Sequence, residues 1–88
     1  MKSVYINIFG QVHHKGFRFY AMQTAYRFGI KGFAHNKKDG SLYIEAEGEE
    51  ENLTEFIEWC KKGPIGAKVE NVTTEEGEIK NYTSFDIK

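Results

Sequence analysis

Apolar and polar residues alternate in two stretches of the chain, and this alternation is typical of a strand with one buried face. The alternating apolar positions are Val4, Ile6 and Ile8 in the first stretch and Leu42, Ile44 and Ala46 in the second. The pattern also predicts strands at about 31–36 and 68–74, with a short last strand at about 83–87. Residues 37–40 predict a hairpin turn, because their Asp-Gly pair tolerates the positive φ of a tight turn.

Helical spacing predicts a helix in the second half of the chain. Its single apolar stripe consists of Leu53, Phe56, Ile57 and Cys60. Acidic residues at 49–51 precede the stripe and Lys61-Lys62 follows it, which suits the helix dipole. Gly63-Pro64 is expected to end this helix.

A weaker helical pattern runs from Arg18 to Phe28. We expect its core stripe to be Met22, Ala25 and Tyr26. Gly29 is placed to end the helix in a left-handed conformation.

The predicted order is strand, helix, strand, strand, helix, strand, with a short strand added at the end. This is the ferredoxin-like split βαβ plan of the α+β class, an antiparallel sheet with two helices on one face. We expect residues 1–88 to form one domain. The fold does not decide the function, because enzymes, RNA binders and metal carriers all use it.

Composition limits the binding partners and the cellular compartment that we expect for this chain. Twelve basic and thirteen acidic residues give a net charge of −1, so no overall field attracts nucleic acid or membrane. The single cysteine, Cys60, excludes an internal disulfide and a cysteine-built metal site. No signal peptide or membrane-spanning stretch is expected, and together these features predict a cytoplasmic protein.

The candidate chemistry begins in the loop between the first strand and the first helix. Gly10 and Gly16 bound this loop, and Arg18 follows at the start of the helix. Converging backbone N–H groups and the helix dipole favour a negatively charged ligand there, and a guanidinium can hold two phosphate oxygens at once. The alternative is that Arg18 is solvated or forms a surface ion pair.

Asn36 stands at the end of the expected second strand. Its side chain offers one acceptor group and one donor group, with which it can hold a water molecule. The alternative is a structural role in which Asn36 caps the turn at 37–40.

Three blocks of residues match the pattern of the acylphosphatases, a family of small α/β hydrolases of carboxyl-phosphate anhydrides. The matching residues are Gly10, Val12, Gly16, Phe17 and Arg18 in the first block, Gly32, Phe33, Asn36, Asp39 and Gly40 in the second, and Gly63, Pro64, Ala67 and Val69 in the third. The blocks extend over essentially the whole chain, which therefore resembles an acylphosphatase.

The resemblance implies hydrolysis of acyl phosphates to carboxylate and inorganic phosphate, without metal or organic cofactor. We also expect a monomer with no nucleic-acid or membrane partner. The phosphate-binding loop that the resemblance implies is His13, His14, Lys15, Gly16, Phe17 and Arg18. Arg18 and this loop would hold the phosphoryl oxygens, while Asn36 orients a water for in-line attack on phosphorus. Because asparagine is a poor general base, the substrate's own phosphate oxygen is expected to accept the proton.

The chain departs from the family pattern at residues 13–15, which are His-His-Lys where the family has Gln-Gly-Val. This departure leaves a second hypothesis open, a non-catalytic module of the same fold that binds an anion or a partner. A metal site at His13, His14 and His35 is disfavoured, because adjacent histidines on an extended loop point apart. An RNA-binding module is disfavoured too, because the first and third strands lack the aromatic pattern of RNA-binding sheets.

Overall fold

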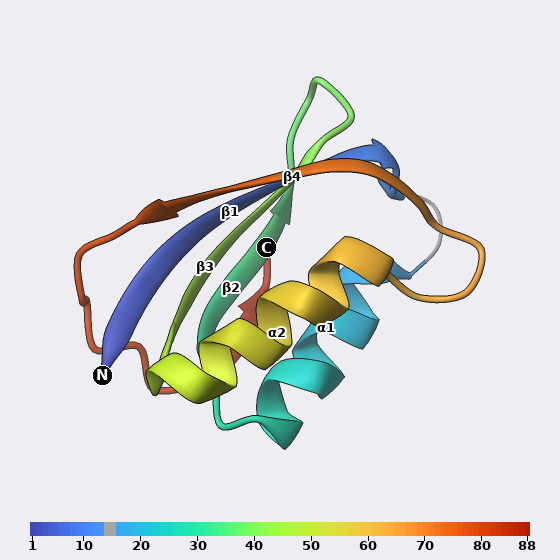
Figure 1. The fold of residues 1–88 in the computed structure, drawn as a ribbon. Helices are drawn as coiled ribbons and strands as arrows, with labels where there is room; N and C mark the ends of the chain where they lie inside the picture. Colours follow the sequence, from blue (N-terminus) through green and yellow to red (C-terminus); the bar gives the residue numbers. More distant parts are fainter. Residues whose placement is uncertain (14–15) are drawn as a thin grey trace.

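The computed structural model of the chain describes residues 1–13 and 16–88. Five strands form one sheet in the order β4-β1-β3-β2-β5, and both helices lie on one face of it (Figure 1). In chain order the elements are β1 (Lys2–Gln11), α1 (Phe17–Arg27), β2 (Lys31–Asn36), β3 (Leu42–Gly48), α2 (Glu50–Lys62), β4 (Lys68–Glu76) and β5 (Phe85–Ile87).

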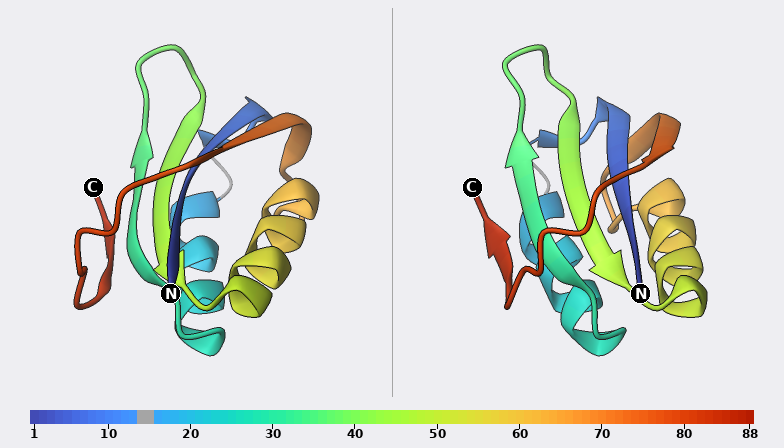
Figure 2. Two further views of the ribbon diagram at one scale, coloured as in Figure 1. Left: turned by 60° about the vertical axis from the view of Figure 1, so that its left-hand side comes forward. Right: turned by 90° about the vertical axis from the view of Figure 1, so that its left-hand side faces the viewer.

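The sheet confirms the predicted ferredoxin-like α+β plan, with one difference in strand direction. β1 pairs with β3 and β4, and β2 pairs with β3, all antiparallel. β5 instead pairs in parallel with β2. β4 ends at the same end of the sheet at which β2 begins. The segment that crosses the sheet therefore brings the chain to the first residues of β2, so β5 starts there and runs in the same direction as β2 (Figure 2).

The core lies between the sheet and the helices. The alternating apolar positions predicted for β1 and β3 face it, and Ile6, Ile8 and Ile44 are fully buried. α2 contributes Leu53, Phe56 and Cys60 from its predicted stripe. In the described part of the chain, neither helix is long and apolar enough to cross a membrane.

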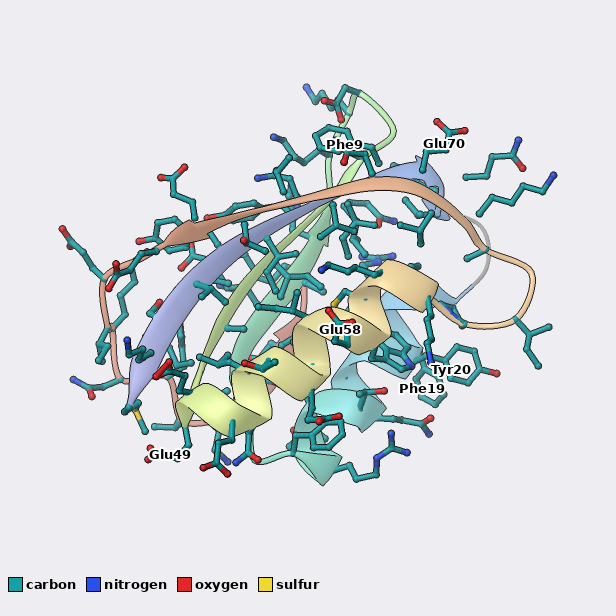
Figure 3. The ribbon with its side chains drawn as sticks, in the orientation of Figure 1. Phe9, Phe19, Tyr20, Glu49, Glu58 and Glu70 are labelled. Carbon is teal, nitrogen blue, oxygen red and sulfur yellow. The ribbon has the colours of Figure 1, made fainter. Side chains whose placement is uncertain are left out.

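The predicted core stripe of α1 is wrong at Tyr26, whose side chain is 54% exposed. The residues of α1 that are buried are Phe17, Ala21, Thr24 and Ala25. Small side chains at most of these positions let the helix lie close to the sheet, and the Thr24 hydroxyl donates to the Tyr20 carbonyl oxygen. The aromatic rings of Phe19 and Tyr20 point outward from the start of α1 (Figure 3).

The segment from residue 77 to 84 crosses the sheet on the face opposite the helices (Figure 2). Two glutamates of β3 hold it there, Glu45 at 8% exposure and Glu47 at 1%. The Glu47 carboxylate accepts the backbone N–H groups of Lys80 and Tyr82. The Glu45 carboxylate accepts the Lys80 ammonium at 2.9 Å and the Tyr82 hydroxyl at 2.6 Å. These bonds fix the position from which β5 joins the sheet.

Candidate active site

Gly10 ends the regular part of β1 and begins the loop. The register of β1 against β4 shifts between Phe9 and Gly10, and Gly10 has a φ of 133°. A Cβ at this position would lie 2.1 Å from the Lys68 carbonyl oxygen. Only glycine therefore lets β1 pass β4 this closely as the chain turns toward α1.

Gly16 adopts the left-handed conformation, with a φ of 66°, at the position immediately before α1. No side chain of residues 1–13 or 16–88 caps the helix, and its first turn holds no acidic residue. The first helical hydrogen bond runs from the Tyr20 N–H to the Gly16 carbonyl oxygen, so the earlier N–H groups have no partner within the helix. An anion is the ligand that best satisfies this uncapped, positively polarised helix start.

Arg18 occupies the first turn of α1 and is half-buried. Its Nη1 donates to the Lys88 carbonyl oxygen at 2.7 Å. Across residues 1–13 and 16–88 no Asp or Glu side chain forms an ion pair with its guanidinium. The contact with Lys88 therefore fixes the position of the guanidinium beside the end of β5.

Asn36 ends β2 and is half-buried. Its Oδ1 is buried and has no hydrogen-bond donor among the residues that the structure describes. The turn is capped by Asp39 instead, whose Oδ1 accepts the Ser41 N–H at 2.9 Å and the Ser41 hydroxyl at 2.6 Å. These bonds also lower the pKa of Asp39. The alternative role of Asn36 as the turn cap is therefore wrong.

The register of the sheet brings the loop and Asn36 to the same level. Leu42 of β3 pairs with Ile8 of β1 on one side and with Asn36 of β2 on the other. Neighbouring strands lie about 4.8 Å apart, so Asn36 stands about 10 Å across the sheet from the strand that leads into the loop.

β5 brings Arg18 to this level as well. Ile87 pairs with Ala34, and the Lys88 N–H donates to the Ala34 carbonyl oxygen at 2.8 Å. Arg18 bonds to the carbonyl of the same Lys88, which follows the part of β5 that is aligned with β2. Arg18 and Asn36 therefore share one end of the sheet.

His13 joins the loop directly to the β2–β3 hairpin. Its Nε2 lies 2.9 Å from the Ser41 carbonyl oxygen. The Lys37 N–H, next in sequence to Asn36, donates to the same oxygen at 2.9 Å. His14 and Lys15, the other loop positions predicted to bind phosphate, lie outside the described residues.

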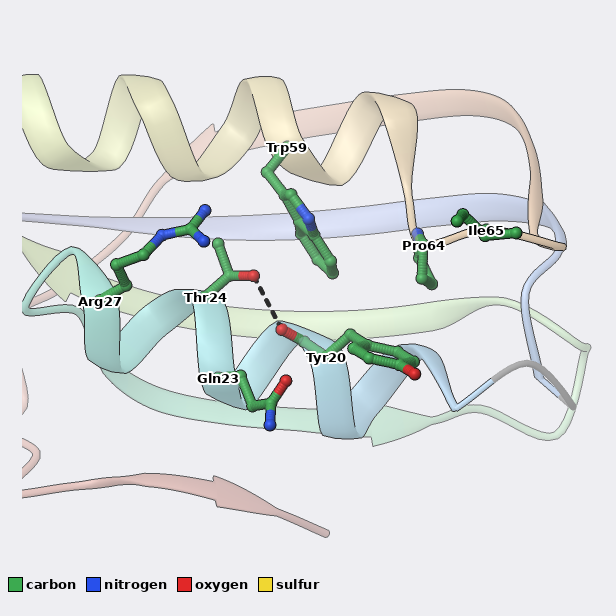
Figure 4. A pocket seen from close by; sticks show the side chains of 7 residues that line it. All are labelled: Tyr20, Gln23, Thr24, Arg27, Trp59, Pro64 and Ile65. Atoms are coloured by element: carbon green, nitrogen blue, oxygen red, sulfur yellow. Dashed lines mark hydrogen bonds between the residues drawn. The ribbon is translucent and has the colours of Figure 1, made fainter.

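A groove on the described surface is separate from this site. Its volume is about 310 Å³, and it lies between α1 and the end of α2, beside Trp59, with Tyr20, Gln23 and Arg27 on its α1 side (Figure 4). At about 100° per residue, these positions centre roughly 180° around the helix from Arg18. The groove therefore opens on the opposite flank of α1.

The remaining candidates for chemistry do not join the site. Among the described residues, no group of three His, Cys, Asp or Glu side chains is placed to hold a metal ion. His35 is exposed and precedes Asn36 on the strand, so the two side chains point to opposite faces of the sheet. Cys60 faces the core as predicted, and burial raises the pKa of its thiol, which makes it a poor nucleophile.

Two contacts of this site were not predicted from the sequence. Lys88 reaches Arg18 across 70 residues of chain, and Ser41 meets His13 across 28. Both contribute a backbone carbonyl oxygen, a group that every residue carries, so no residue type signals the contact.

Comparison with known proteins agrees with this arrangement. The acylphosphatase family model matches residues 4–87. Acylphosphatases from Thermotoga maritima and Archaeoglobus fulgidus are 41% and 40% identical to this chain, covering 100% and 99% of it and 98% of each relative. The crystal structure of acylphosphatase from Bacillus subtilis aligns with a TM-score of 0.96 at 31% identity, over 99% of this chain and 98% of that one. Since sequence and fold both match over almost the whole length, the chain belongs to the acylphosphatase family.

Proposed function

We propose that the loop at residues 13–18 and the Arg18 guanidinium hold the phosphoryl group of an acyl phosphate while Asn36 places the attacking water. The activity itself, hydrolysis of acyl phosphates, follows from membership of the acylphosphatase family and from relatives about 40% identical over the full chain. The observation that supports these roles best is the buried, unpartnered Oδ1 of Asn36 at the same end of the sheet as Arg18.

The proposed reaction is a direct displacement at phosphorus. Water attacks the phosphorus atom, the bond from phosphorus to the bridging oxygen breaks, and the acyl group leaves as a carboxylate. The water proton passes to a phosphoryl oxygen, so one acyl phosphate dianion and one water give a carboxylate and dihydrogen phosphate. Arg18 and the loop amides stabilise the charge on the phosphoryl oxygens as the bond breaks.

The alternative of a non-catalytic binding module rested on the altered residues 13–15. Nothing in the comparisons favours it, since the relatives are named as acylphosphatases. The two functions differ in a simple assay. An anion-binding module would gain thermal stability from inorganic phosphate without hydrolysing an acyl phosphate, whereas the enzyme would do both.

We propose in addition that residues 1–88 work as one monomeric domain in the cytoplasm. The single sheet that contains all five described strands and the solitary buried cysteine support this proposal. Size-exclusion chromatography with light scattering tests the monomer, and a mass near twice 10.2 kDa would contradict it.

The roles are tested by the rate of benzoyl phosphate hydrolysis in Arg18→Ala and Arg27→Ala. Both variants remove one arginine from α1, but Arg27 lies at the other end of the helix, stacked over Phe28. We expect kcat/KM to fall about 100-fold or more in Arg18→Ala, because a charge that stabilises the transition state is lost. The kcat/KM of Arg27→Ala should stay within about threefold of the wild-type value. Equal rates in the two variants would contradict the proposal.

A further inference from the structure

Among the loop residues that the structure describes, His13 joins its side chain to the hairpin that carries Asn36. The bond joins His13 Nε2 to the Ser41 carbonyl oxygen at 2.9 Å. A carbonyl oxygen only accepts, so Nε2 must carry the hydrogen. Nε2–H is present both in one neutral tautomer and in the charged imidazolium. This contact can therefore persist whether or not the ring is protonated.

Ser41, whose carbonyl oxygen accepts this hydrogen bond, is fixed by further hydrogen bonds. Ser41 donates its N–H and its hydroxyl to Asp39 Oδ1, and its carbonyl oxygen also accepts the Lys37 N–H. The next residue, Leu42, is directly paired with Asn36. A displacement of Ser41 relative to the loop would therefore displace Asn36 relative to a phosphate held in the loop.

We propose that His13 is a positioning residue, whose Nε2–H bond to Ser41 sets the distance between the phosphate held by the loop and the water held by Asn36. This proposal rests on the roles given above to the loop and to Asn36. His13 acts through Asn36, so it affects the placement of the water more than the grip on phosphate. The His13 side chain thus has a role of its own, beyond the contribution of the loop backbone.

Substitutions at His13 separate the bond from the bulk of the ring. His13→Gln keeps an N–H donor at a similar reach, His13→Leu fills similar space without a donor, and His13→Asn keeps a donor on a shorter side chain. We expect kcat for benzoyl phosphate to fall about tenfold in His13→Leu and His13→Asn, since small misplacements of reacting groups are costly. His13→Gln should stay within about twofold of wild type, and inhibition by inorganic phosphate should change little in all three.

A double-mutant cycle with Asn36→Ala shows whether His13 acts through Asn36. We expect His13→Leu to lower kcat about tenfold in the wild-type background and less than twofold when Asn36 is already alanine. An equal loss in both backgrounds would overturn the proposal, as would a His13→Leu variant with wild-type kcat. If His13→Leu does not fold, as judged by its melting temperature, His13→Asn takes its place in the cycle.

Failure of the underlying roles would look different. If Asn36→Ala alone kept full kcat, the role given to Asn36 would be wrong and the His13 proposal would fall with it. If Asn36→Ala lost kcat while His13→Leu and His13→Asn did not, only the His13 proposal would fail.

Discussion

Asn36 carries a buried carbonyl oxygen that no described residue satisfies. An unpaired buried acceptor costs about 1–3 kcal/mol, and the turn beside it is already capped by Asp39. Stability therefore gives no reason for an asparagine at this position. Under the role proposed above for Asn36, the attacking water would supply the missing hydrogen-bond donor.

Gly10 is the single residue on which the start of the loop depends most. We expect Gly10→Ala to unfold at clearly lower denaturant concentration than wild type, because its Cβ would collide with the Lys68 carbonyl oxygen. Gly29→Ala is the matched control, since Gly29 has a φ of 68° and open space around its Cβ position. In the control the free energy of unfolding should fall only by the cost of holding alanine in a left-handed conformation, about 1–2 kcal/mol. If urea unfolding showed equal losses of free energy of unfolding in Gly10→Ala and Gly29→Ala, the predicted collision at Gly10 would be contradicted.

Among the elements, β3 connects the two faces of the sheet. Its Leu42, Ile44 and Ala46 face the helices, while Glu45 and Glu47 hold the segment that crosses the other face. Backbone N–H groups bonded to a buried carboxylate form charge-assisted hydrogen bonds. The crossing segment therefore depends on β3, although it belongs to the connection between β4 and β5.

We expect Glu47→Ala to lower the free energy of unfolding by about 3 kcal/mol, because two backbone N–H groups lose a charged acceptor. Urea unfolding measures this loss. Glu49→Ala is the control, since Glu49 is exposed, its carboxylate faces the chain's amino group at 3.6 Å, and its side chain makes no capping hydrogen bond to α2 within the described residues. It should change the free energy of unfolding by less than about 0.5 kcal/mol. A Glu47→Ala variant as stable as the control would contradict the role given to β3.

The elements were predictable from the sequence to different degrees. The stripe of α2 and the alternation in β1 and β3 have strong periods, and their buried residues agree with the prediction. The predicted core stripe of α1 was wrong at Tyr26, because helical spacing alone cannot distinguish an aromatic ring in the core from one in solvent. The parallel pairing of β5 depends on the route of the crossing segment, which follows from the contacts of two buried glutamates.

The site was predictable only in part. Arg18 and Asn36 were predicted as site residues from the local sequence and from the family pattern, and the structure places both at one end of the sheet. The contacts of Arg18 with Lys88 and of His13 with Ser41 were not predictable. They depend on how distant backbone segments meet, which only the complete fold determines.

At the scale of the whole molecule, the crossing segment links the outer strand β4 to β5, which ends beside Arg18. Burial raises the pKa of Glu45, but hydrogen bonds from Lys80, Tyr82 and Tyr43 outweigh it, so the net shift is downward. The same cluster raises the pKa of Tyr82 to about 12, because burial and the Glu45 carboxylate oppose its ionisation. Glu45 is therefore ionised and Tyr82 protonated in the folded protein at neutral pH.

This arrangement predicts how stability depends on pH. A carboxyl group with a lowered folded-state pKa stabilises the fold fully above its ordinary pKa of 4.5, and the contribution is lost as the pH falls through the folded-state value. We expect Glu45→Gln to be less stable than wild type at neutral pH, as measured by thermal unfolding. The difference should shrink as the pH is lowered to about 3. A difference that stays constant over this range would show that Glu45 contributes no charge-dependent stability.

The central claim is that the loop and Arg18 bind the phosphoryl group while Asn36 places the water. The most direct test measures kcat for benzoyl phosphate and the inhibition constant of inorganic phosphate in wild type, Arg18→Ala and Asn36→Ala. We predict that Arg18→Ala loses both turnover and phosphate inhibition, whereas Asn36→Ala loses about 100-fold in kcat and keeps its inhibition constant within about threefold. An equal loss of phosphate inhibition in the two variants, or full kcat in Asn36→Ala, would contradict this division of roles.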